Sequence, residues 1–206
     1  MPTRRQILAG LTALGLAGCQ STGTPQASSQ ASSRGRETGG EGQTPEAKIA
    51  GVTTALMALG PGVDSEEAAR AATIAVRHPL ELAQRWQVVD PPLAHNFKVV
   101  HGIREKGVCR DWATALHEAM RVEGFRTLDL HIGMANARNV SLEHVSLIMT
   151  ARGQPMQSGV LLDPWRIGQG RLWYARVVDD PRYRWETLEA VRAWQAENKA
   201  RALNGL

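Results

Sequence analysis

Apolar positions in the first half of the chain recur with the spacing of α-helices. Residues 46–59 are apolar and Ala-rich and end at a Gly-Pro-Gly sequence. Asp64 is followed three residues later by Glu67, the spacing of a capping box. This pair predicts the start of a second helix, which continues through residues 68–76.

The next helical signals are separated by prolines. His78-Pro79 is expected to end the second helix, and residues 80–87 fit one more short helical segment. Residues 93–104, after a Pro-Pro turn, fit either a helix or an extended segment. Residues 109–122 are a clearer helix, because apolar side chains follow helical spacing at Trp112, Ala113, Leu116, Ala119 and Met120.

The period then changes to that of strands. Residues 127–132 alternate, residues 142–150 form a strong β run, and residues 159–162 and 171–178 fit two further strands. Residues 185–199 return to helical spacing. Helices followed by consecutive strands with short turns predict an α+β domain, in which an antiparallel sheet packs on helices.

The N-terminus has the pattern of an export signal. Arg4-Arg5 precede an apolar stretch at residues 7–16, and small residues lead up to Cys19. This stretch is shorter than the roughly 20 residues of a transmembrane helix. Residues 1–18 are therefore interpreted as a signal peptide.

Two short motifs refine this interpretation. Residues 3–8 resemble the twin-arginine export motif, and Leu16-Ala17-Gly18-Cys19 resembles the lipobox of bacterial lipoproteins. The resemblance implies that Cys19 is lipidated, and Gln20 after it favours sorting to the outer membrane. The alternative is an ordinary secretory signal in which Cys19 is incidental. On the first interpretation the protein is a periplasm-facing membrane lipoprotein.

Composition divides the rest of the chain. Residues 19–43 begin with Cys19, directly after the predicted signal peptide, and are rich in Ser, Gly, Thr and Gln. Such a composition is typical of a disordered linker. Residues 44–206 are long enough for one domain with a proper core. The net charge is +4, but basic residues alternate with acidic ones, so no nucleic-acid partner is expected.

Cys109 is the candidate nucleophile. The chain has two cysteines, and lipidation of Cys19 would leave Cys109 without a disulfide partner in an oxidising compartment. Cys109 stands where a helix begins, and the helix N-terminus favours the thiolate, which is the reactive form. A buried, inert cysteine on a helix is the alternative.

His144 and Asp163 are candidates for the base and for the group that orients it. His144 lies in the strongest β run and Asp163 ends the next strand. Neighbouring antiparallel strands can place both side chains on one face, and we expect the Cys109 helix to pack across that face. Each residue also has an ordinary interpretation, as a strand histidine and as an aspartate that starts a turn.

The same segments resemble the transglutaminase-like superfamily. Residues 107–113 match a Gly-x-Cys-x-Asp-x-Ala start, and residues 121–126 match a basic-x-x-Gly-hydrophobic exit into a strand. A strand His followed by an Asp-Pro pair completes the pattern, at His144 and at Asp163-Pro164. The likeness covers residues 107–165. Val145-Ser146 replaces the usual aromatic residue after the His, which leaves the subfamily open.

The resemblance implies a papain-like α+β fold and a Cys-His-Asp mechanism without metal or organic cofactor. Cys109 would attack an amide carbonyl, His144 would protonate the leaving amine, and Asp163 would orient the imidazolium. Water or an amine would then accept the acyl group. A cell-wall amidase with a Cys-His-polar triad is a related possibility, against which Asp163 argues.

Other residues have supporting interpretations. The backbone N–H of Cys109 is one expected oxyanion donor. Asn96 is favoured as the second donor over Trp86 and His95, and all three also fit packing or surface roles. Asp111 is expected either to cap its helix or to accept a hydrogen bond from a neighbouring loop. No zinc site is expected, because the histidines lack ligand spacing. A late aromatic group could line a groove or fill the core: Trp165, Trp173, Tyr174 and Trp185.

The resulting hypothesis is a lipid-anchored envelope cysteine peptidase or amidase. Its expected partners are a peptide or protein amide substrate, for which a cell-wall peptide is one option, and the membrane through the lipid anchor. The alternative is a non-catalytic envelope lipoprotein that uses the same fold as a binding or scaffold module.

Overall fold

The computed structural model describes residues 42–139 and 141–203, which belong to one compact unit. The predicted signal peptide (1–18), Cys19 and all but the last two residues of the predicted linker (19–43) lie outside the described residues. Within the described ranges, no helix combines the length and hydrophobicity that a membrane span requires.

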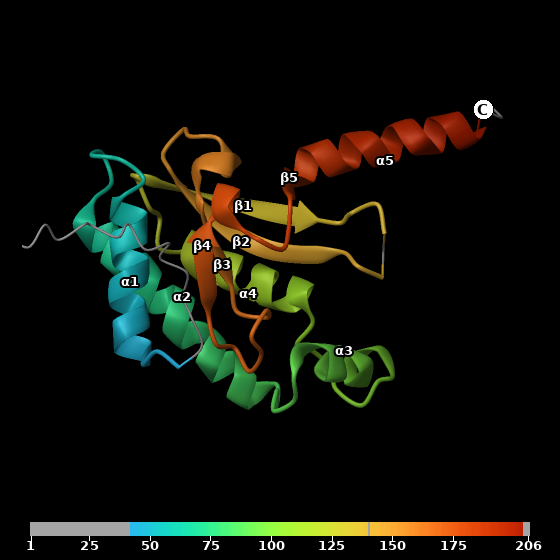
Figure 1. Cartoon of the computed structure of the whole chain (residues 1–206), viewed down its shortest axis with the longest axis horizontal. Helices are drawn as coiled ribbons and strands as arrows, with labels where there is room; N and C mark the ends of the chain where they lie inside the picture. Colours follow the sequence, from blue (N-terminus) through green and yellow to red (C-terminus); the bar gives the residue numbers. More distant parts are fainter. Residues whose placement is uncertain (1–41, 140, 204–206) are drawn as a thin grey trace, which may run out of the picture. The chain divides into compact units, whose positions relative to one another are not determined.

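The described chain has five α-helices and five strands (Figure 1). Two short 3-10 turns, Met156–Ser158 and Val177–Asp179, interrupt the strand region. In chain order the elements are α1 (Pro45–Met57), α2 (Ser65–Arg85), α3 (Pro92–Val100), α4 (Cys109–Arg121), β1 (Leu128–Ala135), β2 (His144–Ala151), β3 (Val160–Asp163), β4 (Trp173–Arg176), β5 (Trp185–Thr187) and α5 (Leu188–Leu203).

The strands form one sheet in the order β4-β3-β2-β1-β5, and every pair is antiparallel. Leu147 of β2 pairs with Leu162 of β3 and with Ile132 of β1. The α+β class and the four strands expected from alternation are confirmed. Antiparallel neighbours need only short connections, which agrees with the turn signals of the sequence.

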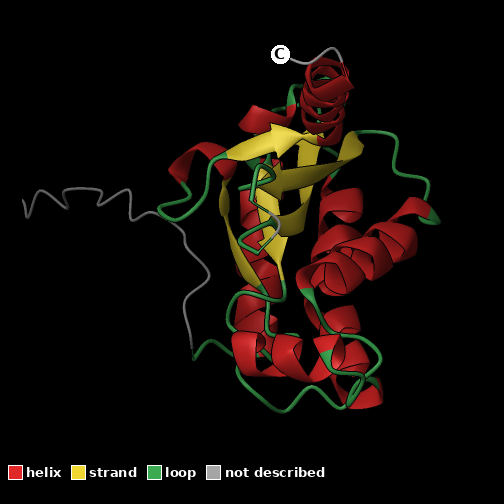
Figure 2. Ribbon diagram, turned by 90° about the vertical axis from the view of Figure 1, so that its right-hand side faces the viewer, coloured by secondary structure: helices red, strands yellow, loops and turns green. Residues whose placement is uncertain are grey.

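Helices cover one face of the sheet (Figures 1 and 2). Because side chains alternate along a strand, Leu147 and Met149 point to this face and pack against Leu116 and Met120 of α4. Helices α1 and α2 add to the same core, mainly with small and branched side chains: Val52, Leu56, Ala68, Ala71, Ala72, Ala75 and Val76.

The opposite face carries a smaller apolar cluster. Ile148 and Leu161 point to this side and pack with Met156, Val177 and Trp185. The two 3-10 turns therefore cover part of this face in place of long helices. The sheet is buried on both faces of its central strand, which explains why β2 is a nearly continuous apolar run.

The expected break at Pro79 is wrong. Helix α2 continues through Pro79 to Arg85, so the two predicted segments are one helix. A proline inside a helix removes one backbone donor and usually kinks the helix. Here Pro79 is itself buried, and Leu82 and Ala83 beyond it bury apolar surface in a further cluster. Tertiary burial therefore outweighs the local cost.

The start of the C-terminal helix also differs from the prediction. Trp185–Thr187 forms strand β5, in which Trp185 pairs with Ala135, and α5 begins at Leu188. The ambiguous segment after the Pro-Pro turn is helical, as α3. Both outcomes depend on partners distant in sequence, which a local period does not include.

The predicted capping box at α2 is half formed. The Asp64 carboxylate accepts the backbone N–H of Glu67 at 2.9 Å, as expected. The Glu67 carboxylate does not return to Asp64 but accepts the backbone N–H groups of Arg126 and Thr127, at 2.8 and 2.9 Å. Burial opposes the charged form of Glu67, but hydrogen bonds from Thr127 and Arg126 lower its pKa.

Candidate active site

Cys109 is the first residue of α4, and the segment before it is tightly held. The Asp111 carboxylate accepts the backbone N–H groups of Gly107 and Val108, at 2.8 and 3.1 Å. The Trp112 indole N–H donates to the carbonyl oxygen of Gly107 at 2.8 Å. Asp111 therefore caps the helix, as the sequence indicated, and the position of Cys109 is set by its own neighbours.

His95 also holds the segment that precedes Cys109. It is fully buried, and its Nε2–H donates to the carbonyl oxygen of Lys106 at 2.9 Å. Gly107 has φ +124°, and a Cβ there would lie 2.5 Å from His95 Nε2. Glycine is required because the chain turns tightly against the imidazole just before Cys109.

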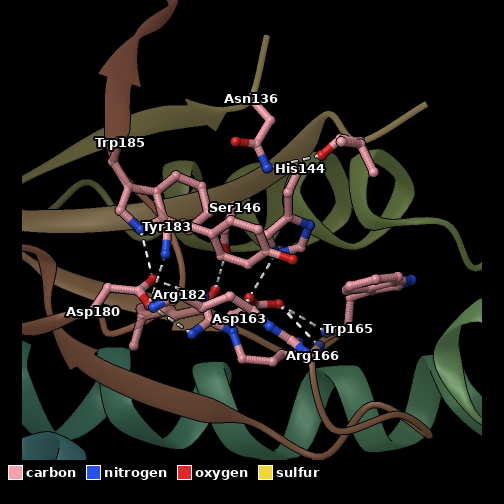
Figure 3. Close-up of polar contacts among 12 residues, drawn as sticks. Asn136, His144, Ser146, Asp163, Trp165, Arg166, Asp180, Arg182, Tyr183 and Trp185 are labelled. Carbon is pink, nitrogen blue, oxygen red and sulfur yellow. Dashed lines mark hydrogen bonds and ion pairs between the residues drawn. The ribbon is translucent and has the colours of Figure 1, made fainter. Parts of the chain in front are cut away.

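His144 and Asp163 meet at one end of neighbouring strands. His144 is the first residue of β2 and Asp163 is the last residue of β3. His144 Nε2–H donates to Asp163 Oδ2 at 2.6 Å, and both side chains are buried (Figure 3). The structure therefore brings together the two residues that the sequence placed on adjacent strands.

The Cys109 side chain interacts with the imidazole of His144 and helps to raise its pKa. Burial disfavours the charged ring, but the hydrogen bond to Asp163 and the interaction with the Cys109 side chain outweigh it and raise the pKa of His144 to about 9. The second ring nitrogen, Nδ1, is buried and has no hydrogen-bond partner other than Cys109 among the described residues. Cys109 itself is partly exposed to solvent.

The expected packing of the Cys109 helix is wrong. His144 and Asp163 alternate with Val145 and Leu162, so they point to the face opposite the one that α4 covers. Cys109 reaches the imidazole at the end of the sheet instead, where it packs against the cluster that contains Val145. Cys109 is the first residue of α4 and His144 is the first residue of β2, so the two side chains meet at the edge where β2 begins.

Arg166 extends the site behind Asp163. Its Nε–H donates to Asp163 Oδ2 at 3.0 Å, and its two terminal nitrogens donate to both carboxylate oxygens of Asp180 at 3.0 and 2.8 Å. Burial opposes both charges. The ion pair nevertheless raises the pKa of Arg166 and lowers that of Asp180, to which Arg182 and Trp185 also donate. A buried row of alternating charges therefore runs from His144 to Asp180.

Aromatic rings enclose this row. The ring centroids of Trp165 and Tyr183 both lie 4.8 Å from that of His144, and that of Trp185 lies 5.5 Å away (Figure 3). The Arg166 guanidinium stacks 3.6 Å from the Trp173 ring centroid. Of the late aromatic residues, Trp165 and Trp185 surround the site, Trp173 holds Arg166, and Tyr174 packs in the main core.

The three candidates for the second oxyanion donor have different surroundings. The Oδ1 of Asn96 accepts the indole N–H of Trp165 at 3.0 Å, which connects α3 to the ring beside His144. Trp86 packs against Trp112, with ring centroids 4.7 Å apart, and His95 is engaged with Lys106. Trp86 and His95 are thus packing residues, and Asn96 is the candidate with a contact beside the imidazole.

Three further residues belong to the site and are not identified by the periodic pattern of the sequence: Arg166, Asp180 and Tyr183. Arg166 follows the recognised Asp-Pro-Trp segment directly, but its ion-pair partner lies 14 residues further on, across β4. No periodic pattern connects such positions. The signal that was present is compositional: charged residues between aromatic ones near a candidate catalytic aspartate.

Comparisons with protein-family models, with curated proteins and with solved structures gave no match to this chain. Within residues 42–139 and 141–203, His, Cys, Asp and Glu side chains do not gather in groups of three or more that could hold a metal ion.

Proposed function

We propose that the protein is a cysteine peptidase or amidase that uses Cys109, His144 and Asp163 as a catalytic triad on a papain-like, transglutaminase-like core. The observation that carries the proposal is the buried 2.6 Å hydrogen bond from His144 to Asp163, on an imidazole that also interacts with the partly exposed Cys109 thiol. A nucleophile, a base and an orienting carboxylate are the parts that covalent acyl transfer needs.

The geometry assigns a task to each ring nitrogen. Asp163 accepts the Nε2–H, so Nδ1 is the nitrogen that exchanges a proton with Cys109. The sulfur attacks the amide carbonyl and forms a C–S bond. The C–N bond breaks as His144 protonates the leaving amine, which produces a thioester. Water then attacks the thioester after His144 takes one of its protons, and the sulfur leaves as the restored thiolate.

The raised pKa of His144 fits the first half of this cycle. With a pKa of about 9, the ring is charged at neutral pH and holds the proton that the leaving amine needs. A charged imidazolium beside Cys109 also favours the thiolate. An amine in place of water would give transamidation, and the same residues would serve.

The envelope location forms part of the proposal. Export and lipidation are carried by Arg4-Arg5 and by Leu16-Ala17-Gly18-Cys19, which lie outside the described residues. A lipid on Cys19 would anchor the domain to the periplasmic side of a membrane, with the outer membrane favoured by Gln20. A cell-wall peptide is a substrate that this compartment offers.

The proposal is tested by the pH dependence of alkylation at Cys109. The full chain is treated with iodoacetamide between pH 5 and 10, and labelling is measured on the Cys109 peptide by mass spectrometry, so that Cys19 does not interfere. An unperturbed thiol has a pKa of about 8.5. We expect fast labelling down to about pH 6, and its loss in His144→Ala.

His101→Ala, which removes an exposed histidine outside the site, is the matched control and should label like the wild type. Slow labelling that follows an ordinary thiol and ignores His144 would overturn the triad. That outcome would favour the non-catalytic binding or scaffold module.

A further inference from the structure

A groove lies beside Cys109, on the face of the sheet that α4 covers, between α4, the β1–β2 hairpin and α5. Its volume is about 350 Å³, within the range of small-molecule sites. Its apolar lining, called the floor here, comes from α4, the β1–β2 hairpin and α5: Ala113, Ile132, Met134, Val145, Leu188 and Val191.

Cys109 and His144 do not line the groove themselves, but residues next to them in the chain do. Arg110, which lines it, follows Cys109, while Glu143 and Val145 lie on either side of His144. Cys109 packs against the apolar cluster formed by the same floor residues. An acyl group attached to the Cys109 sulfur would therefore find this groove next to it.

The rim of the groove carries an unbalanced positive charge. Arg110 pairs with Glu143 at 2.6 Å, so these two charges offset each other. Arg192 of α5 also lines the groove, is exposed, and makes no hydrogen bond or ion pair with the described residues. A guanidinium that is open to solvent beside an apolar floor is suited to a carboxylate.

We propose that this groove is the acyl-side subsite and that it selects substrates with an aliphatic side chain next to the scissile amide and a carboxylate on the same acyl portion. The aliphatic group lies on the floor and the carboxylate binds Arg192. This inference rests on the proposed function, because it assigns a substrate class to the same site.

Helix α5 forms one wall of the proposed subsite. Val191 is its buried residue, and the later turns of the helix extend away from the sheet (Figure 1). Their side chains are mostly exposed. Its first turns supply Leu188, Val191 and Arg192 to the groove. The helix is thus a wall of the subsite, and its side chains determine substrate choice more than the stability of the core.

The test compares two covalent probes on the full chain: succinyl-leucine chloromethyl ketone, which has a free carboxylate, and its acetyl-leucine analogue. In each, the Cys109 thiolate forms a C–S bond at the methylene and displaces chloride. We expect the succinyl probe to label Cys109 about threefold faster, the factor of one solvent-exposed ion pair.

Arg192→Gln should reduce the ratio of the two labelling rates to about one, since this variant removes the contact. Arg201→Gln, on the same helix but outside the groove, is the matched control and should retain the wild-type ratio. Thr114→Trp, an exposed lining position, should fill the groove and slow both probes about tenfold relative to iodoacetamide. Equal wild-type rates for the two probes, or an Arg192→Gln ratio like that of the wild type, would overturn the subsite.

Iodoacetamide labelling separates this inference from the proposed function. If iodoacetamide reacts rapidly and depends on His144 while the two ketones do not differ, the triad stands and the subsite fails. If iodoacetamide shows no His144 dependence, the triad fails and the subsite fails with it.

Discussion

Arg166 lies between the carboxylates of Asp163 and Asp180, and its positive charge stabilises both of them. It contacts Asp163 and Asp180 while its guanidinium lies against Trp173, and it is almost completely buried. Without Arg166, two carboxylates would lie near each other in a poorly solvated region. Arg166 and the charged imidazolium of His144 together balance the charges of Asp163 and Asp180, and two backbone N–H groups also hold the Asp163 carboxylate in place.

This arrangement predicts a large cost for Asp180→Ala. The variant leaves Arg166 buried with one carboxylate instead of two and removes the acceptor of the Trp185 indole N–H. We expect a loss of about 3 kcal/mol in the free energy of unfolding, measured by urea denaturation. Asp179→Ala, at the exposed neighbouring position, should change it by less than about 0.5 kcal/mol. Equal effects at the two positions would contradict the network.

At the scale of elements, α2 and the β3–β4 connection depend on each other. Pro79 stays within α2, and its backbone carbonyl lies against Gly170 in the connection that also carries Arg166. A Cβ at Gly170 would be 2.2 Å from the Pro79 oxygen. Packing against α2 therefore positions the β3–β4 connection, which carries Arg166 of the site.

Gly170→Ala tests this contact, and Gly153→Ala is its matched control. The two glycines have similar φ, +69° and +72°, so both variants carry the strain of a left-handed alanine, about 1 kcal/mol. Gly153 has open space around its Cβ position, whereas Gly170 faces backbone. We expect Gly170→Ala to lower the free energy of unfolding by about 2 kcal/mol more than Gly153→Ala. Equal melting curves would mean that the connection moves freely away from α2.

At the scale of the whole molecule, His144 couples folding to pH. Its folded pKa of about 9 lies above the ~6.5 of an ordinary histidine. Its contribution to stability is therefore complete below about pH 6.5 and is lost as the pH rises through about 9. The stability of the wild type should fall by about 3 kcal/mol over this interval.

Denaturation at several pH values measures this effect. His144→Gln should lack the decline between about pH 6.5 and 9.5, because it has no ring to titrate. His101→Gln should retain it, as the control for losing an exposed histidine. A wild type whose stability is constant over that range would show that His144 is not held in its charged form.

Much of the architecture was accessible from local pattern. The order of helices and strands, the start of α4 at Cys109, and the placement of His144 and Asp163 on adjacent strands all follow from periodicity and turn chemistry. The errors occurred where a distant partner decided the outcome. Burial carries α2 through Pro79, and pairing with Ala135 makes Trp185 part of a strand.

The sequence by itself determined which residue types stand at helix starts and strand ends, because hydrogen bonding within a few residues sets those positions. Tertiary structure alone decided that Cys109 meets His144 around the end of the sheet. It also decided that Arg166 pairs with Asp180, and that α5 closes a groove beside Cys109. These features join side chains that are distant along the chain, so they exist only once the sheet and helices have packed and excluded water.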